Sequence, residues 1–584
     1  MKKQEYVMLW GLFIGITALH VVMADFPKIM TIYPDELRYL SIARSISEGK
    51  LLIHNTESDF QKILYSLIIA PAFWVNSPIL QIKIISWLNS ILVSTSIFPV
   101  YLLGKKMLRE NWKKYFIAIF SGVMPATLLA MTFMSEVIFI PLSLWTIFIG
   151  YRILDEENER KKIKLAAIFG ILCYLCYLNK EISLYYIISM VCICVRSIYK
   201  KQNRRAEATA LITVIVFFAL PHFFMKLTIF SGMGNSYDQM GLLEVLSVKK
   251  VLYMVYALFY NSIFATIAVG IFPIILFIDG FKEKREKEKR FMLFVMLAWL
   301  VGIGAIVYTI SVREDYSNLS IRQHLRYLEP LTIPLLVNIL AKEKIVYKKT
   351  IIKGFFAFGI LLSFILHRVG NGPIVDQQSL LYYNFIIDRV NAVLGSGAII
   401  GERVVKILLL GFMVTGGVFL FRRSYKDFLG FFLSTFLCVN IININLGFYA
   451  IRTEYGISKK VQKEMAILSE ILNKLEGNIL VISPRGLEKD NRLIDTYIDR
   501  PLYITSIEYS EMDAAIQDGI IDLENEKVFV EWPWGYYKNL TTIDYILAEK
   551  DIQLDNVKKI GEGVVGCEYV LYKNSFPEKV FVSK

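Results

Sequence analysis

The strongest constraint on the fold is a series of long apolar runs. A helix that crosses a bilayer needs about 20 predominantly apolar residues, and thirteen runs come close to that length. The composition agrees, because 55% of the residues are hydrophobic and the mean hydropathy is +0.48. The sequence therefore predicts a polytopic α-helical membrane protein with about 13 transmembrane helices. The runs lie at 6–26, 79–103, 115–134, 136–154, 163–178, 182–198, 207–230, 257–278, 291–311, 327–341, 350–367, 404–421 and 428–450.

Lysine and arginine cluster in every second loop, and with thirteen spans all these clusters fall on one side of the membrane. Basic loops stay in the cytoplasm, so we expect a cytoplasmic N-terminus and an extracytoplasmic C-terminus. This topology accounts for the net charge of +13 without a nucleic-acid partner. We expect an integral protein of a bacterial plasma membrane, in contact with membrane lipids. The outer loops would be 27–78, 231–256, 312–326 and 368–403.

Two apolar segments near the N-terminus need a separate interpretation. Residues 62–75 are apolar but too short to cross, and no basic loop follows them, so we expect an interfacial or re-entrant helix. The first 26 residues begin with basic residues, as a signal peptide does. Their apolar stretch is long and no clear small-x-small cleavage site follows, which favours a retained first span.

The composition changes after residue 452, where charged residues become frequent. We predict a transmembrane domain over 1–452 and a soluble extracytoplasmic α/β domain over 453–584. The second domain has no glycine-rich phosphate loop, no metal-spaced set of His or Cys and no nucleophile elbow, so we assign it no chemistry. Its β-like runs are Asn478 to Ser483, Pro501 to Ile507, Lys527 to Trp532 and Cys567 to Tyr572.

The densest polar feature outside the membrane follows the first span. Residues 33–49 read as a helix, because Pro34 suits a first turn and Gly49 suits the exit. Asp35 and Glu36 have two interpretations on the residues alone. They either stabilise the positive N-terminus of this helix or belong to a site at the outer membrane face.

This segment resembles the first external loop of GT-C superfamily glycosyltransferases, especially the branch of protein O-mannosyltransferases and lipid A aminoarabinose transferases. The resemblance rests on Asp35-Glu36 followed by Tyr39, Ala43-Arg44 and Gly49. It covers the first 110 residues specifically and the rest of the membrane domain loosely. It implies transfer of a sugar from a polyprenyl-phosphate-linked donor to a hydroxyl of a protein, lipid or cell-wall glycan acceptor on the outer face.

The resemblance also implies roles for residues of the first loop. Asp35 would be the general base that deprotonates the acceptor hydroxyl, and Glu36 would orient the acceptor or tune the base. The stretch from Phe60 to Leu67, which includes Tyr65, resembles the family's Lys-Pro-Pro-Leu-Tyr element but lacks both prolines. Lys62 would then meet the lipid phosphate. The alternative is a lysine that snorkels to the interface.

Further candidates follow later outer turns. Glu136 stands where the superfamily often has a second acidic motif, with Tyr39, Tyr65 and His324 as its possible companions at the acceptor. Alternatively, Ser135 caps a helix and Glu136 complements its dipole. Polar residues Asn179-Lys180-Glu181 at the next outer turn either join the site or are simply the turn of a two-span hairpin.

The segment from Arg322 to Tyr327 resembles the family's Arg-Tyr element. It implies that Arg322 and Arg326 bind the donor phosphate, and lipid head groups are the alternative ligand. The resemblance requires no nucleotide and no certain cofactor. A divalent ion between Asp35 and Glu136 is one further expectation, because hard cations favour carboxylates.

Three other functions compete with this hypothesis. A transporter or flippase would carry ionisable residues at mid-span, whereas the candidate charges gather at helix ends. A polysaccharide polymerase or ligase would use a large late outer loop, for which 368–403 qualifies. A receptor or scaffold would act through the soluble tail.

Overall fold

The structure is a computed structural model in which part of the chain is described. The described residues are 3–25, 34–49, 62–201, 203–230, 247–277, 279–313, 324–368, 398–455, 467–482, 502–505, 520–522, 529–532, 536–538, 542–549, 554–561, 569–577 and 579–582.

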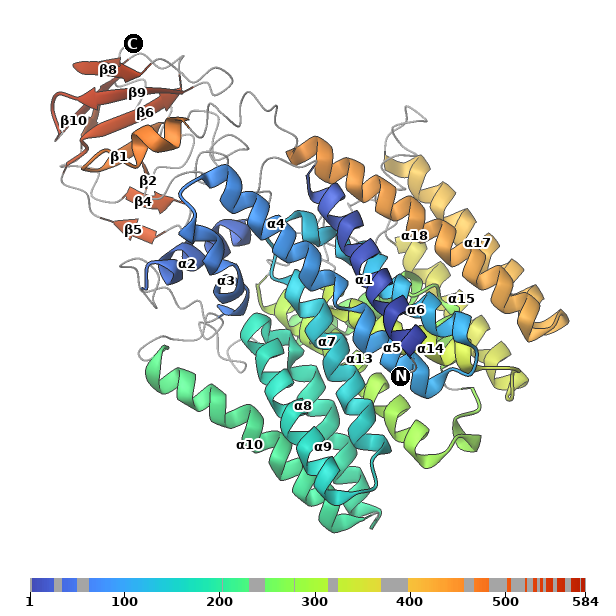
Figure 1. The fold of residues 1–584 in the computed structure, drawn as a ribbon. Coiled ribbons are helices and arrows are strands. Elements are labelled where there is room, and N and C mark those ends of the chain that lie inside the picture. Colours follow the sequence, from blue (N-terminus) through green and yellow to red (C-terminus); the bar gives the residue numbers. More distant parts are fainter. Residues whose placement is uncertain are drawn as a thin grey trace.

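Long apolar helices build most of the molecule, and the predicted polytopic helical fold is confirmed (Figure 1). In the described part of the chain, nine helices are long and apolar enough to cross a membrane, or ten if the bent pair α6 and η2 forms one span. The helices of the first half are α1 (Lys3–Ala24), α4 (Pro78–Ser94), α5 (Ile97–Met107), α6 (Asn111–Val123), η2 (Pro125–Met131), α7 (Glu136–Asp155), α8 (Glu159–Asn179), η3 (Glu181–Ser183), α9 (Leu184–Tyr199) and α10 (Arg204–Thr228).

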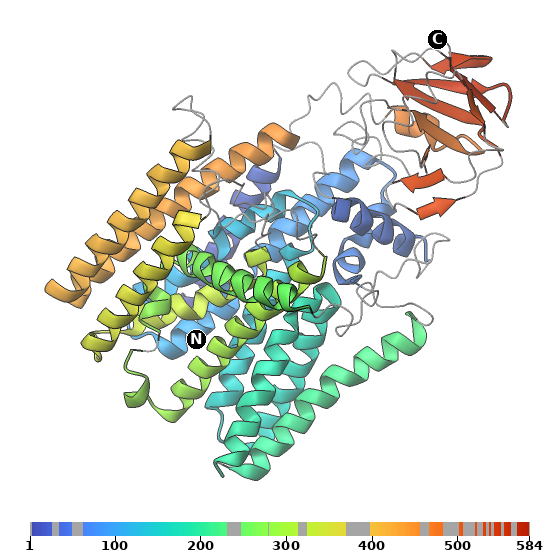
Figure 2. The same ribbon diagram turned by 180° about the vertical axis from the view of Figure 1, so that it is seen from behind.

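The second half of the bundle packs along the first. Helices α17 and α18 lie side by side on one flank and α8 to α10 on the other, as both views show (Figures 1 and 2). This half contains α11 (Val248–Ala268), α12 (Phe272–Ile275), η4 (Phe281–Glu283), α13 (Glu286–Arg313), η5 (His324–Leu331), α14 (Thr332–Ala341), α15 (Lys348–Arg368), α17 (Ala398–Arg422) and α18 (Tyr425–Tyr455).

Besides the run at 115–134, which forms the bent pair α6 and η2, two predicted spans differ from the helices that form. The run predicted at 257–278 corresponds to α11, which begins at Val248 and ends at Ala268. The chain leaves the helix there because Gly270 and Ile271 adopt φ angles of +83° and +63°. The run at 327–341 becomes the 3₁₀ helix η5 followed by the ten-residue helix α14.

The short apolar segment 62–75 forms two small helices, as the sequence predicts. They are α3 (Leu64–Ile69) and η1 (Ala70–Trp74), and together they are too short to cross a bilayer. Both pack against α2 (Pro34–Ser47), the helix that carries Asp35 and Glu36. The described helices of the predicted first outer loop, α2, α3 and η1, therefore pack against one another.

The C-terminal region forms the predicted α/β structure. Its main sheet has the order β5-β4-β2-β1-β6-β9-β8 in the described residues, with β1 parallel to β2 and β6 and the other pairs antiparallel. The four β-like runs correspond to β1, β2, β4 and β9. The strands are β1 (Ile479–Ile482), β2 (Leu502–Thr505), β3 (Ile520–Asp522), β4 (Phe529–Trp532), β5 (Tyr536–Lys538), β6 (Tyr545–Glu549), β7 (Leu554–Asp555), β8 (Val557–Gly561), β9 (Tyr569–Asn574) and β10 (Lys579–Val582).

The sheet lies at the same end of the bundle as α2 and α3 (Figures 1 and 2). Leu468 and Leu472, which precede β1, belong to the same hydrophobic cluster as Tyr39 and Tyr65. The domain boundary at residue 452 stays a prediction, as does the side of the membrane on which the sheet lies. Helix α18 continues to Tyr455.

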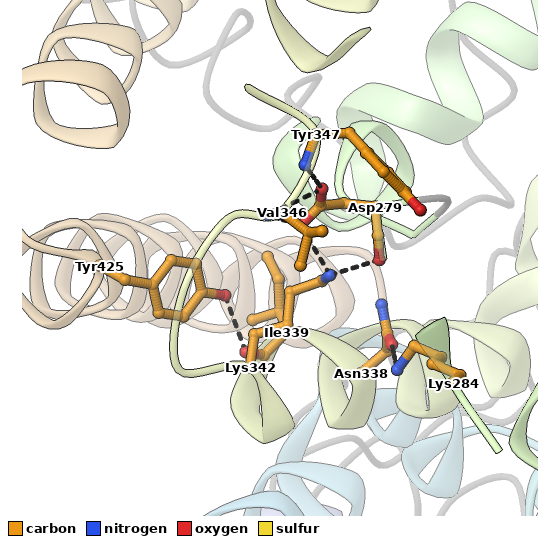
Figure 3. Close-up of polar contacts among 8 residues, drawn as sticks. All are labelled: Asp279, Lys284, Asn338, Ile339, Lys342, Val346, Tyr347 and Tyr425. Atoms are coloured by element: carbon orange, nitrogen blue, oxygen red, sulfur yellow. Dashed lines mark hydrogen bonds and ion pairs between the residues drawn. The ribbon is translucent and has the colours of Figure 1, made fainter. Parts of the chain in front are cut away.

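The centre of the bundle is a short enclosed segment. Every residue of α14 from Thr332 to Leu340 is buried, and η5 and α14 together contact α5, α6, α7 and α13. Polar clusters lie at its two ends. The one after α14 is built on Asp279, which binds the turn that contains Lys342, Val346 and Tyr347 (Figure 3). The one at η5 includes several of the predicted site residues.

Candidate active site

Helix α2 buries Glu36 and Tyr39 against the rest of the protein. Glu36 is completely buried, and its Oε1 accepts a hydrogen bond of 2.7 Å from the backbone N–H of Phe133. Tyr39 lies on the same side of the helix because it is three residues further on. Its hydroxyl shares a hydrogen bond of 2.8 Å with the Ser135 hydroxyl. Both side chains thus fix α2 to the segment between η2 and α7. The side chain of Asp35 lies outside the described atoms.

Helix α3 joins the same unit through a buried phenol. The ring of Tyr65 packs edge-on against Tyr39 with centroids 5.4 Å apart, and its hydroxyl donates to Asn89 Oδ1 at 3.1 Å. Asn89 in turn donates to the carbonyl of Thr132 at 2.9 Å. Burial raises the pKa of Tyr65 well above its ordinary value, so this side chain remains a neutral donor.

Glu136 is the centre of a buried ion cluster. Its Oε1 lies 2.9 Å from Nε of Arg326 in η5 and 3.5 Å from Nζ of Lys180, which follows α8. Its Oε2 has no hydrogen-bond partner in the described part of the chain. Ser135 does not cap α7 with its side chain, because its hydroxyl bonds to Tyr39 instead. Glu136 therefore pairs with two cations and is more than a dipole partner of α7, while its role in a site stays a prediction.

Lys62 forms a second buried pair beside the first. Its Nζ lies 2.9 Å from Glu181 Oε1 and 4.0 Å from the ring centroid of Tyr177. The side chain is only 7% exposed, so it does not extend to an interface as a snorkelling lysine would. Burial lowers the pKa of Lys62, and the charge of Glu181 offsets part of that decrease.

The aromatic rings of Tyr39 in α2 and Tyr327 in η5 both lie near Lys180. Lys180 lies 5.8 Å from the ring centroid of Tyr39 and 5.5 Å from that of Tyr327. Arg326 donates to the Tyr327 hydroxyl at 3.0 Å, and the Tyr327 carbonyl accepts from Tyr185 at 2.9 Å. The structure thus brings Arg326 to Glu136 and Lys180 to Tyr39. Arg322 and the side chain of His324 lie outside the described atoms.

The polar turn after α8 contributes more than the sequence indicated. Lys180 pairs with Glu136, Glu181 pairs with Lys62, and Asn179 donates to the Ser135 carbonyl at 2.8 Å. A hairpin between spans needs polar residues, so the residue types alone did not distinguish the two interpretations. The signal was their position, at the same predicted membrane face as Glu136.

The described residues contain no group of three His, Cys, Asp or Glu side chains that could hold a metal ion. Glu136 already faces two cations, which is an unfavourable setting for a divalent ion. The expected ion between Asp35 and Glu136 therefore stays a prediction. The same holds for phosphate binding by Lys62 and Arg326.

Comparisons with known proteins identify the fold. The sequence matches no family model and no curated protein. Among solved structures, chains with a similar fold are found, and at this level of identity the likeness concerns the fold.

One such structure is ArnT from Cupriavidus metallidurans bound to undecaprenyl phosphate. It shares 12% sequence identity over 98% of both chains, with a TM-score of 0.50. The archaeal oligosaccharyltransferase AglB from Archaeoglobus fulgidus, in complex with an inhibitory peptide and a dolichol-phosphate, has a TM-score of 0.42. It shares 9% identity over 92% of this chain and 69% of that one.

Proposed function

We propose that this protein is a membrane glycosyltransferase that moves a sugar from a polyprenyl-phosphate-linked donor to an acceptor hydroxyl on the outer face of the membrane. The observation that carries the proposal is the junction of α2 with the Glu136 cluster. Glu36 and Tyr39 bind the segment that leads into Glu136, and Glu136 pairs with Arg326 and Lys180. The fold around this junction is similar to that of ArnT. The presence of undecaprenyl phosphate in ArnT supports the choice of donor.

The acidic helix would supply the base. Asp35 would take the proton of the acceptor hydroxyl while its oxygen attacks the anomeric carbon. The bond from that carbon to the phosphate oxygen breaks in the same step, so the configuration at the anomeric carbon inverts. Glu36 is held by the Phe133 N–H, and it therefore fixes the helix that carries Asp35. We assign Glu36 to this positioning role or to contact with the acceptor.

The leaving group is a lipid phosphate, whose charge grows as the bond breaks. Buried cations in a water-poor site stabilise such charge strongly. Lys62 and Arg326 are our candidates, with Arg322 as a third. Both described cations now pair with carboxylates, Glu181 and Glu136, so they are held in place before a phosphate arrives.

The test compares the wild type with Asp35→Asn in lipid nanodiscs. Radiolabelled polyprenyl-phosphate sugars and a membrane extract serve as donor and acceptor source. Glu48→Gln is the matched control, because Glu48 is an exposed acid just beyond the C-terminal end of the same helix. We expect transfer by the wild type and the control and a loss of about 10²-fold or more in Asp35→Asn.

Two results would contradict parts of the proposal. Equal transfer by Asp35→Asn and the wild type would remove Asp35 as the base and leave it as a helix-stabilising acid. No transfer from any donor by the wild type would reject the glycosyltransferase and favour a transporter or a scaffold. Polymer formation from lipid-linked sugars alone, without an added acceptor, would indicate a polymerase.

A further inference from the structure

A further buried acid, in addition to Glu36, Glu136 and Asp279, lies one 3₁₀ turn beyond Arg326. Glu329 is 2% exposed in η5, and its Oε1 accepts a hydrogen bond of 3.1 Å from the backbone N–H of Ala126. Its Oε2 has no hydrogen-bond partner among the residues that the structure describes. The site described above does not use this side chain.

Burial of a carboxyl group at this position costs folding free energy that an apolar side chain would not cost. Neighbouring residues Leu325, Leu328 and Leu331 are buried, and all seven residues of η2 are buried as well. An apolar residue would pack here without loss of solvation, whereas an acid inside the bundle must be compensated. Its one described bond reaches Ala126, whose N–H lies in the first turn of η2 and therefore lacks a partner within that helix.

Glu329 and Arg326 lie on the same side of η5, because residues three apart eclipse in a 3₁₀ helix. Each binds a different end of one chain segment. Glu329 binds its start at Ala126, and Arg326 binds its end at Glu136. Between these two points, the segment supplies the Phe133 N–H to Glu36 and the Ser135 hydroxyl to Tyr39.

We propose that Glu329 is a positioning residue of the site. Its bond to Ala126 fixes η2 against η5, and this sets the location of the backbone and side chains that hold Glu36, Tyr39 and Glu136. Glu329 acts through these residues and does not contact the reacting groups. The catalytic consequence of the inference rests on the proposed function, but the structural consequence does not.

Two substitutions distinguish the effect of the Glu329–Ala126 hydrogen bond from the effect of the negative charge of Glu329. Glu329→Gln keeps an oxygen that can accept from Ala126, and Glu329→Leu fills a similar volume without an acceptor. The first measurement is amide hydrogen exchange of the purified full-length protein in nanodiscs, followed by mass spectrometry. We expect faster exchange of peptides that cover 124–136 in Glu329→Leu, and exchange as slow as in the wild type in Glu329→Gln.

The second measurement is steady-state sugar transfer. We expect kcat to fall about tenfold or more in Glu329→Leu with a smaller change in the KM for the lipid donor, because displaced catalytic groups slow the chemical step. In Glu329→Gln, kcat should remain close to the wild-type value. Asp279→Asn is the matched control, since Asp279 also accepts from backbone N–H groups but lies at the other end of α14.

Each outcome decides the inference. Restored exchange protection and restored kcat in Glu329→Gln support it. Equal defects in Glu329→Gln and Glu329→Leu would overturn it, because charge and not the bond to Ala126 would then matter. Unchanged exchange over 124–136 in Glu329→Leu would also overturn it. If the wild type transfers no sugar, the proposed function fails, whereas the exchange comparison still decides whether Glu329 positions the segment.

Discussion

Two carboxylates at opposite ends of the η5–α14 segment are equally buried and yet differently bound. Asp279 accepts from the N–H of Tyr347 at 2.7 Å, from the N–H of Val346 at 3.2 Å and from Lys342 Nζ at 3.0 Å (Figure 3). Glu136 instead faces two side-chain cations, and its Oε2 has no hydrogen-bond partner in the described residues.

Under the proposed function, this difference separates a structural carboxylate, Asp279, from a carboxylate of the site, Glu136. Backbone N–H groups cannot turn toward a ligand without unfolding their loop, so the hydrogen bonds from Val346 and Tyr347 to Asp279 persist as long as the loop is folded. Side-chain cations can exchange a carboxylate for another anion by a rotation of the side chain. We therefore expect substitutions at Glu136 to change both stability and activity, and those at Asp279 to change stability alone.

The largest effect is expected for Glu136→Leu. The substitution leaves Arg326 and Lys180 buried without their counter-charge, which typically costs about 3–5 kcal/mol of folding free energy. Thermal unfolding in nanodiscs should show the loss of stability, and the transfer assay should show no activity. Glu136→Leu combined with Lys180→Met removes one of the two cations, and it should recover part of the stability. Unchanged stability in the single variant would contradict the ion cluster.

An effect on stability alone, without loss of activity, is expected for Asp279→Ala. It leaves two backbone N–H groups and one ammonium without their acceptor, at a cost of about 1–3 kcal/mol for each buried group that stays unsatisfied. The melting temperature should fall, while kcat measured well below it should match the wild type. A fall in kcat at full structural integrity would break the comparison, because the Asp279 cluster would then influence the reaction.

The smallest effect is a pH dependence of stability caused by Lys62. Burial lowers the pKa of Lys62 in the folded protein below its ordinary value of 10.5. At a pH between the folded pKa and 10.5, the unfolded chain therefore binds more protons than the folded protein. The contribution of Lys62 to stability should therefore increase as the pH rises through the folded pKa toward 10.5. The free energy of unfolding, measured by denaturation across this pH range, should show the rise in the wild type and lack it in Lys62→Met. Glu181→Gln should make the rise larger, because the charge of Glu181 no longer offsets the decrease in the pKa of Lys62.

The fold could be predicted because hydrophobic periodicity and length are local properties. Each predicted apolar run coincides at least partly with a helix, and the errors arise at particular residues. Gly270, directly after the C-cap of α11, is a helix-stop signal that the continuous apolar run obscured, and the positive φ of the β-branched Ile271 had no signal of its own. The prolines at 330 and 334 shortened the run at 327–341 into η5 and α14.

The site could be predicted only where residues form a recognisable pattern. Glu36 and Tyr39 belong to such a pattern, and Glu136 was found by its position at an outer helix end. Lys180 and Glu181 had a plausible role as turn residues, and their pairing with Glu136 and Lys62 depends on tertiary packing. Glu329 is an isolated acid whose partner lies 203 residues away, a contact that no local pattern encodes.

The enclosure of α14 has a consequence for the biogenesis of the protein. A ten-residue helix with all residues from Thr332 to Leu340 buried is too short to be stable in lipid as an independent span. It needs α5, α6 and α12 around it before its backbone is shielded. Arg326 and Tyr327 are carried by the same segment, so they reach Glu136 only when the bundle has closed. A partly inserted chain therefore has no assembled cation cluster, and under the proposed function it would consume no lipid-linked sugar before folding is complete.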